Sequence, residues 1–236
     1  VARQYGRVGA MSELYGVTGW DFDFRRHKLA GDWQAALGVT LRVHHLAWDS
    51  MGGEAKRDYP ASIFYQSPWY REYGLIEDHF ARLNTALTRG RAVIRIGVIH
   101  PIESYWLHYG PSEQTALIRQ ELEERYENVT QWLLFSQLDF DYISEGLLPE
   151  QYEKSSDGRL HVGRMAYDAI VVPGCETPRA STISCLDEFL AGGGNLPFLG
   201  DAPRYVDAVF SNAGKKLYEK SRHIGFSRSA LLSALA

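Results

Sequence analysis

The sequence predicts an α/β protein built from two differently patterned parts. In the second part, short apolar segments of strand length alternate with amphipathic helices, and such alternation implies a parallel, doubly wound sheet. The first part contains two strand–helix units, which make only a portion of a larger structure. A short polar joint at residues 88–91 separates the two parts. We therefore expect one domain over residues 1–90, a second over 91–205, and a truncated tail over 206–236.

The first part is expected to fold as strand, helix, strand and helix. Residues 9–14 and 40–48 have the character of strands, and residues 27–37 form a helix between them. A second helix is predicted over residues 68–87. Its apolar face recurs every three to four residues and consists of Tyr73, Ile76, Phe80, Leu83 and Leu87.

The second part opens with a strand at residues 94–99 that has the apolar character of a buried strand. A long helix follows from Ser112, because apolar residues recur at helical spacing through residues 118–133. Two further strands are predicted at residues 140–143 and 167–172. The second of these is continuously apolar, as is typical of a strand that is covered on both faces.

A helix capped by Ser181 leads into the last predicted strand. The helix stops at three glycines, residues 192–194, and the strand after it ends near Gly200. Pro197 sits inside this strand, where it cannot donate a ladder hydrogen bond. We therefore expect the strand to lie at an edge of the sheet or to be locally distorted.

Composition excludes two classes of partner. The chain has 236 residues, of which 45% are hydrophobic and 13% aromatic, so it can bury a core. A net charge of −4, with acidic and basic residues interspersed, leaves no basic surface for a nucleic acid or for a membrane. No apolar stretch approaches the roughly 20 residues that cross a bilayer. We expect neither a nucleic acid nor a membrane among the partners.

The number and spacing of the cysteines indicate the redox state of the compartment and whether a metal site is expected. Cys175 and Cys185 cannot build a disulfide framework and lack metal-ligand spacing. This favours a cytoplasmic location, although the sequence leaves localisation open. No ligand cluster dense enough for calcium stands out, so we expect no metal and no cofactor.

Polar and aromatic residues collect at the carboxyl ends of both strands of the first part. In a βα barrel the active site lies at this end. A carboxylate beside aromatic rings suits sugar chemistry, because the rings stack on sugar faces and the carboxylate stabilises or attacks the anomeric carbon. The candidates are Glu13, Tyr15, Trp20 and Asp21 after the first strand, and His44, His45, Trp48, Glu54, Arg57 and Asp58 after the second.

These candidates belong to a series of short motifs that resembles the closing part of bacterial glycoside hydrolase barrels. The series is similar to family 106 α-L-rhamnosidase-like enzymes and, more distantly, to family 42 β-galactosidases. In the family 42 pattern a Glu ends the seventh barrel strand, a Trp ends the eighth, a Gly-x-Glu-Lys-like loop follows, and a flavodoxin-like domain comes next. Glu13, Trp48, residues 53–56 and the chain from Arg91 fall in this order. The motifs are SELYG at 12–16, GWD at 19–21, GDW at 31–33, LGV at 37–39, HHL at 44–46, KRDYP at 56–60 and SPW at 67–69.

The resemblance implies both a fold and an activity. The first part would be the closing βα units of an incomplete (β/α)8 barrel, followed by a flavodoxin-like domain of the glutamine-amidotransferase-like kind. The parent enzyme would hydrolyse O-glycosidic bonds in a plant- or microbe-derived oligosaccharide, as an α-L-rhamnosidase or a β-galactosidase. Glu13 would be the nucleophile of a retaining enzyme or the general base of an inverting one. The second catalytic acid would belong to an earlier strand that this chain lacks, so we expect the chain alone to be inactive.

Other readings of the same residues stay open. Glu13 could be an ordinary surface or hydrogen-bonded carboxylate. His44 and His45 are adjacent on a strand, so their side chains point to opposite faces, which argues against a two-histidine metal site. Either histidine could bind a sugar hydroxyl or serve in the core. Arg57 and Asp58 could clamp the substrate or brace their loop as a salt bridge.

The predicted fold of the second domain allows other functions, each of which requires particular residues. A flavin site needs a Ser/Thr/Gly-rich phosphate loop after the first strand, which residues 100–106 do not provide. A receiver domain needs an Asp where Pro173 stands, and an amidotransferase needs a second glycine after Cys175. The remaining alternative is a non-catalytic interaction or oligomerisation module, with a homo-oligomer formed through this domain.

Overall fold

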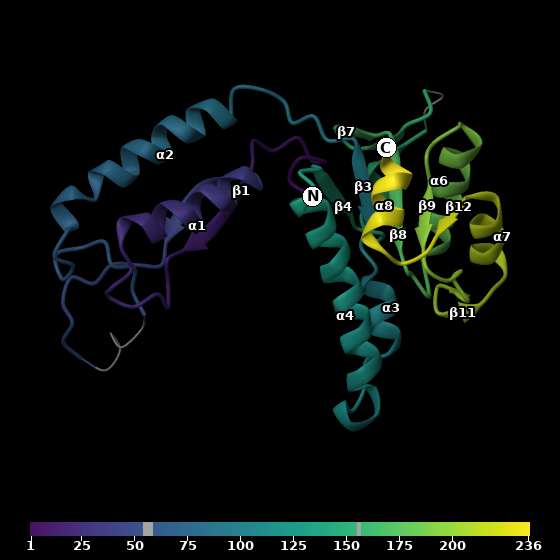
Figure 1. Cartoon of the computed structure of the whole chain (residues 1–236), viewed down its shortest axis with the longest axis horizontal. Coiled ribbons are helices and arrows are strands. Elements are labelled where there is room, and N and C mark those ends of the chain that lie inside the picture. Colours follow the sequence, from purple (N-terminus) through teal and green to yellow (C-terminus); the bar gives the residue numbers. More distant parts are fainter. Residues whose placement is uncertain (54–58, 155–156) are drawn as a thin grey trace. The chain divides into compact units, whose positions relative to one another are not determined.

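The computed structural model describes residues 1–53, 59–154 and 157–236. The chain divides into two compact units (Figure 1). The N-terminal unit comprises Ala2 and Gly6–Ala92, and the C-terminal unit comprises Val1, Arg3–Tyr5 and Val93–Ala236. Among the described residues, no helix is both long enough and apolar enough to cross a bilayer.

The N-terminal unit is built on two parallel strands. Strand β1 (Ala10–Leu14) pairs with β2 (Val39–His44), and helix α1 (Phe24–Ala36) connects them. After β2 come a short 3-10 helix, η2 (Tyr70–Glu72), and helix α2 (Gly74–Leu87). Strand β2 ends earlier than the predicted strand over residues 40–48, because the backbone at Leu46 turns into the left-handed region with a φ of 40°.

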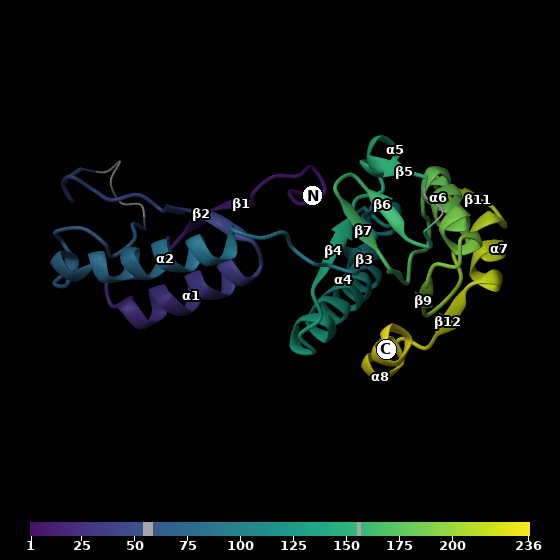
Figure 2. The same ribbon diagram turned by 90° about the horizontal axis from the view of Figure 1, so that it is seen from above.

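Both helices cover one face of this strand pair (Figure 2). Gly31 of α1 permits close packing, because a Cβ there would lie 2.1 Å from Cζ of Phe80 on α2. The guanidinium of Arg42 stacks 3.7 Å from the centre of the buried Phe80 ring. On β1 and β2, Met11, Leu41 and Val43 are exposed. The strand pair therefore has one face covered by helices and one face that is apolar and exposed.

The C-terminal unit is centred on a five-stranded sheet in the order β12-β9-β8-β3-β4, with every pair parallel. In chain order this is 5-4-3-1-2, the reverse reading of the flavodoxin-like order. Strand β3 is buried throughout, as its continuous apolar sequence predicts. The strands are β3 (Ile96–Ile99), β4 (Phe140–Ile143), β8 (Ala169–Pro173), β9 (Pro197–Leu199) and β12 (Arg222–Ile224).

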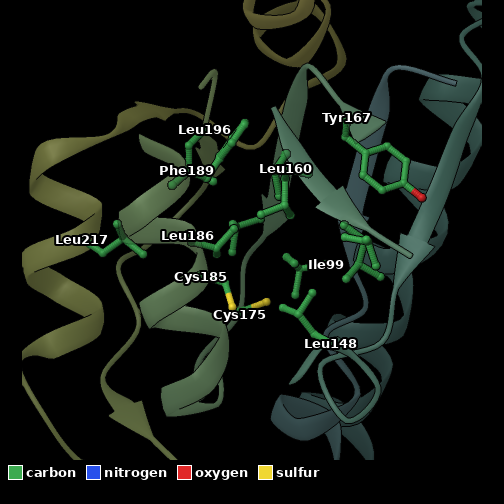
Figure 3. Packing of buried hydrophobic residues seen from close by; sticks show 14 of the residues in the cluster. Ile99, Leu148, Leu160, Tyr167, Cys175, Cys185, Leu186, Phe189, Leu196 and Leu217 are labelled. Atoms are coloured by element: carbon green, nitrogen blue, oxygen red, sulfur yellow. The ribbon is translucent and has the colours of Figure 1, made fainter. Parts of the chain in front are cut away.

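Helices cover both faces of the sheet. One face packs against α4 (Ser112–Phe135) and α8 (Arg228–Leu235), where Val129, Leu133 and Leu231 are buried. The other face packs against α5 (Leu148–Gln151), α6 (Ala180–Ala191) and α7 (Ala213–Lys220). Figure 3 shows this second layer, where Leu186 of α6 and Leu217 of α7 pack against buried side chains of the sheet. Helix α3 (Ile102–Leu107) follows β3 directly.

Two smaller sheets complete the unit. Strands β5 (Tyr152–Glu153), β6 (Leu160–Val162) and β7 (Met165–Tyr167) form an antiparallel meander. Strands β10 (Tyr205–Val206) and β11 (Val209–Phe210) form a hairpin.

The stretch expected to be a tail over 206–236 is instead an integral part of this unit. It supplies β11, α7, β12 and α8, and β12 is a strand of the central sheet. Its helices are short and amphipathic, so their patterns are weak in sequence although they bury Leu217 and Leu231.

Two local predictions differ from the structure, and for Pro197 the second of the two expected alternatives, a local distortion of the strand, holds. Tyr167 ends the meander strand β7, and the buried strand after it begins at Ala169. Helix α6 begins at Ala180, and Ser181 lies inside its first turn instead of capping it. Strand β9 lies between β8 and β12, so it is not an edge strand. Pro197 is tolerated as its first residue, at an interruption of the ladder with β8 between the bridge at Asn195 and the pairing at Phe198.

Residues 3–5 are held in the C-terminal unit by polar side chains. Arg3 forms a 2.9 Å salt bridge with the buried Asp141 on β4. The Gln4 amide donates to the Tyr167 hydroxyl over 3.0 Å, and that hydroxyl donates to Asp141 over 3.0 Å. The backbone of Gln4 lies so close that a Cβ at Gly163 would be 2.1 Å from its carbonyl oxygen. This network ties the start of the chain to the sheet.

We expect Tyr167→Phe to lower the free energy of unfolding of the C-terminal unit by about 1–3 kcal/mol. The change leaves a buried oxygen of Asp141 without this donor and removes the acceptor of the Gln4 amide. Urea unfolding measures the effect. The matched control is Tyr109→Phe at an exposed position, which should cost less than about 0.5 kcal/mol. Equal stability of the two variants would contradict the prediction.

Candidate functional site

The candidate site centres on a carboxylate and an imidazole at the carboxyl ends of the two parallel strands. Glu13 lies on β1 opposite Val43, and His45 directly follows β2. His45 Nδ1 lies 2.8 Å from Glu13 Oε1, so the Nδ1–H tautomer donates to the carboxylate. The Glu13 side chain is 66% exposed. The pair therefore lies on the face of the strands that the helices leave uncovered.

An open pocket of about 410 Å³ adjoins this pair. Its wall includes the turn after β1 and the middle of α1. Among the lining residues that the structure describes, Glu13 is the one carboxylate and His45 the one imidazole. The lining consists of Glu13, Leu14, Tyr15, Gly16, Val17, Thr18, Phe22, Ala30, Gln34 and His45.

Gly16 makes room for the histidine. A Cβ at this position would lie 2.6 Å from Cδ2 and 2.7 Å from Cγ of His45. Only a residue without a side chain lets the imidazole lie this close to the turn after β1. The glycine of the SELYG motif therefore has a direct geometric role in the Glu13–His45 pair.

His44 points away from this pair, toward the helices. Its Nε2 lies 2.8 Å from the Tyr73 hydroxyl and 3.3 Å from Glu77 Oε1. Burial lowers the pKa of His44, and the nearby Glu77 carboxylate opposes that shift. The two adjacent histidine side chains therefore lie on opposite faces of the strand and contact different residues. Among the described residues, no group of three His, Cys, Asp or Glu side chains is arranged to hold a metal ion.

Tyr15 is also turned toward the helices. Its ring is buried, 4.5 Å from that of His27 between centroids, and its hydroxyl donates to the His27 carbonyl over 3.2 Å. Burial raises the pKa of this hydroxyl. The Tyr15 backbone turns with a φ of 70°, which directs the chain into the pocket wall while the ring packs in the core. A ring placed in this way offers no face to a sugar.

The remaining candidates are dispersed. Asp21 forms an exposed 2.9 Å salt bridge with Arg26, which lowers the pKa of the carboxyl. Trp20 is 38% exposed and Trp48 is half-buried, and neither lines the pocket. Glu54, Arg57 and Asp58 lie outside the described residues.

Three residues that were not among the predicted site residues organise the covered face behind the site. Arg42 Nη2 donates to Glu77 over 2.9 Å, and Arg42 Nη1 donates to the Tyr15 hydroxyl over 3.3 Å. Tyr73 completes the set through its contact with His44. Arg42 lies two residues before His44 on β2, so strand alternation places both on the same face. The spacing of two residues could have indicated this shared face from the sequence. The packing of α2 against that face could not be predicted in the same way.

Gly16→Ala is expected to displace His45 and to break its hydrogen bond with Glu13, because the added methyl group would overlap the imidazole. The histidine side-chain NMR signals of His45 should shift, while those of His44 should not. Gly74→Ala is the control, since nothing lies within 4 Å of a Cβ built there. Unchanged His45 signals in the Gly16 variant would contradict the described packing.

The N-terminal unit is expected to lose stability as the pH falls below about 6.5. Burial lowers the pKa of both His27 and His44, so the folded state binds fewer protons than the unfolded state in this range. Urea unfolding at about pH 7.5 and about pH 5.5 measures the effect. His27→Gln and His44→Gln should each reduce the difference between the two values. Stability that increases on acidification would refute this assignment.

Comparison with known proteins gives a likeness of fold. No protein-family profile and no curated protein matches the chain. A solved structure of a catalytic mutant of Gan42B, a GH42 β-galactosidase from G. stearothermophilus, matches with a TM-score of 0.50 and 18% identity. The match covers 78% of this chain and 25% of that one. A second structure of Gan42B matches with a TM-score of 0.47 and 18% identity, over 80% of this chain and 25% of that one. The chain thus spans about a quarter of the length of these structures, and its fold resembles part of a GH42 enzyme.

Proposed function

We propose that this chain contributes a catalytic carboxylate, Glu13, to the hydrolysis of O-glycosidic bonds. The observation that carries the proposal is the Glu13–His45 hydrogen bond at the carboxyl ends of two parallel strands. In this proposal β1-α1-β2-α2 forms the closing units of a (β/α)8 barrel. Helices outside and reactive groups at the carboxyl ends of the strands are the arrangement of such barrels. The fold likeness to part of a GH42 β-galactosidase supports the choice of reaction.

Glu13 can act in either of two ways. In a retaining reaction its carboxylate attacks the anomeric carbon and forms a glycosyl ester, while in an inverting reaction it removes a proton from the attacking water. His45 donates to one carboxylate oxygen and so orients the group. The substrate would be an α-L-rhamnoside or a β-galactoside. His44 and Tyr15 support the site from the covered face.

The reaction needs a second carboxylic acid to protonate the leaving oxygen. Within the described residues, the pocket lining provides no carboxylate other than Glu13. The exposed apolar side chains of Met11, Leu41 and Val43 lie on the face opposite the helices, which in a barrel points to the interior and packs against side chains of the other strands. We therefore place the acid on such strands and expect the chain by itself to be inactive.

A second candidate function is an interaction or oligomerisation module. Tyr109, between helices α3 and α4, and Leu117, within α4, are among the most exposed apolar residues of the C-terminal unit. Exposed apolar side chains of this size favour a protein partner, such as a second copy of the chain. This candidate requires no catalysis from Glu13.

The test is hydrolysis of nitrophenyl galactosides and rhamnosides by the chain alone and by a protein that joins it to the missing barrel strands. We expect activity only in the second protein. Glu13→Gln should lower kcat/KM by roughly 10³-fold or more, because the amide is neither a nucleophile nor a base. Asp78→Asn, which removes an exposed carboxylate on α2, is the matched control and should leave kcat/KM unchanged.

Each alternative outcome has a definite meaning. Activity of the short chain would overturn the assignment of the acid to other strands. Full activity after Glu13→Gln would overturn the role of Glu13. If neither protein hydrolyses these glycosides and sedimentation shows dimers or larger species, the oligomerisation module would be favoured.

A further inference from the structure

A second pocket, of about 540 Å³, lies in the C-terminal unit at the carboxyl edge of its sheet. Its residues come from helix α3 after β3, from the loop between β8 and α6, and from the β10–β11 hairpin. Strands β3 and β8 are neighbours, and the chain leaves them toward opposite faces of the sheet. In open α/β sheets such a switch point is where ligands bind. The lining consists of Glu103, Trp106, Leu107, Thr177, Arg179, Asp207 and Ala208.

The pocket presents hydrogen-bond donors and acceptors side by side. Arg179 Nε donates to Glu103 Oε1 over 2.6 Å, and the two side chains are only partly exposed. This leaves the rest of the guanidinium as a set of donors next to carboxylate acceptors. Asp207 provides a further carboxylate in the lining. A guanidinium and a carboxylate in direct contact can donate to and accept from two neighbouring hydroxyl groups of one ligand.

The pocket disfavours anions, because the N-terminus of helix α6 is already satisfied by carboxylates of the protein. The Ala180 N–H donates to Asp207 Oδ1 over 3.2 Å, and the Arg179 N–H donates to Glu145 Oε2 over 2.8 Å. Glu145 is 1% exposed, and burial raises its pKa. In folds of this class the helix N-terminus commonly receives a phosphate. Here a phosphate would meet the carboxylates of Asp207 and Glu103 instead.

Trp106 provides an aromatic surface at the same place. It lies on α3, lines the pocket and is 56% exposed. Aromatic rings cover the apolar face of a sugar, while its hydroxyls bond to the polar groups around the ring. Glu103 is balanced by Arg179, and Asp207 accepts from the N-terminus of α6, so the lining fits an uncharged ligand.

We infer that the C-terminal unit binds a neutral saccharide at this switch point, with Trp106 stacked on one sugar face and Glu103 and Arg179 bonded to vicinal hydroxyls. This site is separate from Glu13 and does not depend on hydrolysis. It would hold carbohydrate on the C-terminal unit whether or not the proposed reaction takes place.

The experiment is a titration of the ¹⁵N-labelled chain with D-galactose, L-rhamnose and lactose, followed through its tryptophan indole N–H signals. The chain has 6 tryptophans, and the Trp106 signal is identified by its loss in Trp106→Ala. We expect saturable shifts of the Trp106 signal with at least one sugar. Binding should weaken about tenfold in Trp106→Ala, measured by calorimetry or by ligand-observed NMR. Inorganic phosphate should produce no saturable shift.

A control variant and the choice of readout separate this site from the other unit. Trp33→Ala removes an exposed indole on α1 and should leave the affinity unchanged. The readout is the Trp106 signal and not turnover, so failure of the proposed hydrolysis and failure of this site give different results. The inference is overturned if no sugar shifts the Trp106 signal, if Trp106→Ala binds as tightly as the parent chain, or if phosphate competes with the sugar.

Discussion

Parallel strand pairing is the constraint on which the rest of this structure depends. A parallel pair cannot be joined by a tight turn, so each strand must be followed by a crossover that packs on the sheet. This requirement accounts for α1 between β1 and β2, and for the helices that cover both faces of the five-stranded sheet. It also brings all carboxyl ends of a sheet to one edge. The Glu13–His45 pair and the pocket beside Trp106 both lie at such an edge.

Because successive side chains of a strand point to opposite faces, neighbouring residues contact different groups. His44 and His45 are adjacent in sequence, yet one contacts Tyr73 on the helix side and the other contacts Glu13 on the exposed side. Desolvation lowers the pKa of His44, whereas Glu13 of the other pair is mostly exposed to solvent. A single strand end therefore provides both a structural histidine and a candidate functional one.

The two edges differ in how their charges are balanced. At the first, one carboxylate faces an open pocket, as suits a group that reacts with or stabilises a developing positive charge. At the second, carboxylates are committed to Arg179 and to the start of α6, so the pocket combines polar groups with little net charge. These balances favour chemistry at the first edge and recognition of a neutral ligand at the second.

The sequence by itself determined the alternation of strands and helices, because apolar periodicity reports burial directly. It placed strand β4 at residues 140–143 and the long helix from Ser112, and it assigned Glu13 and His45 to the carboxyl ends of the two strands of the first part. Only the tertiary structure decided that Tyr15 packs inward, that Pro197 lies on an interior strand, and that residues after Val206 complete the sheet. These outcomes depend on contacts between segments far apart in the chain, such as Arg179 with Glu103, which no local pattern encodes.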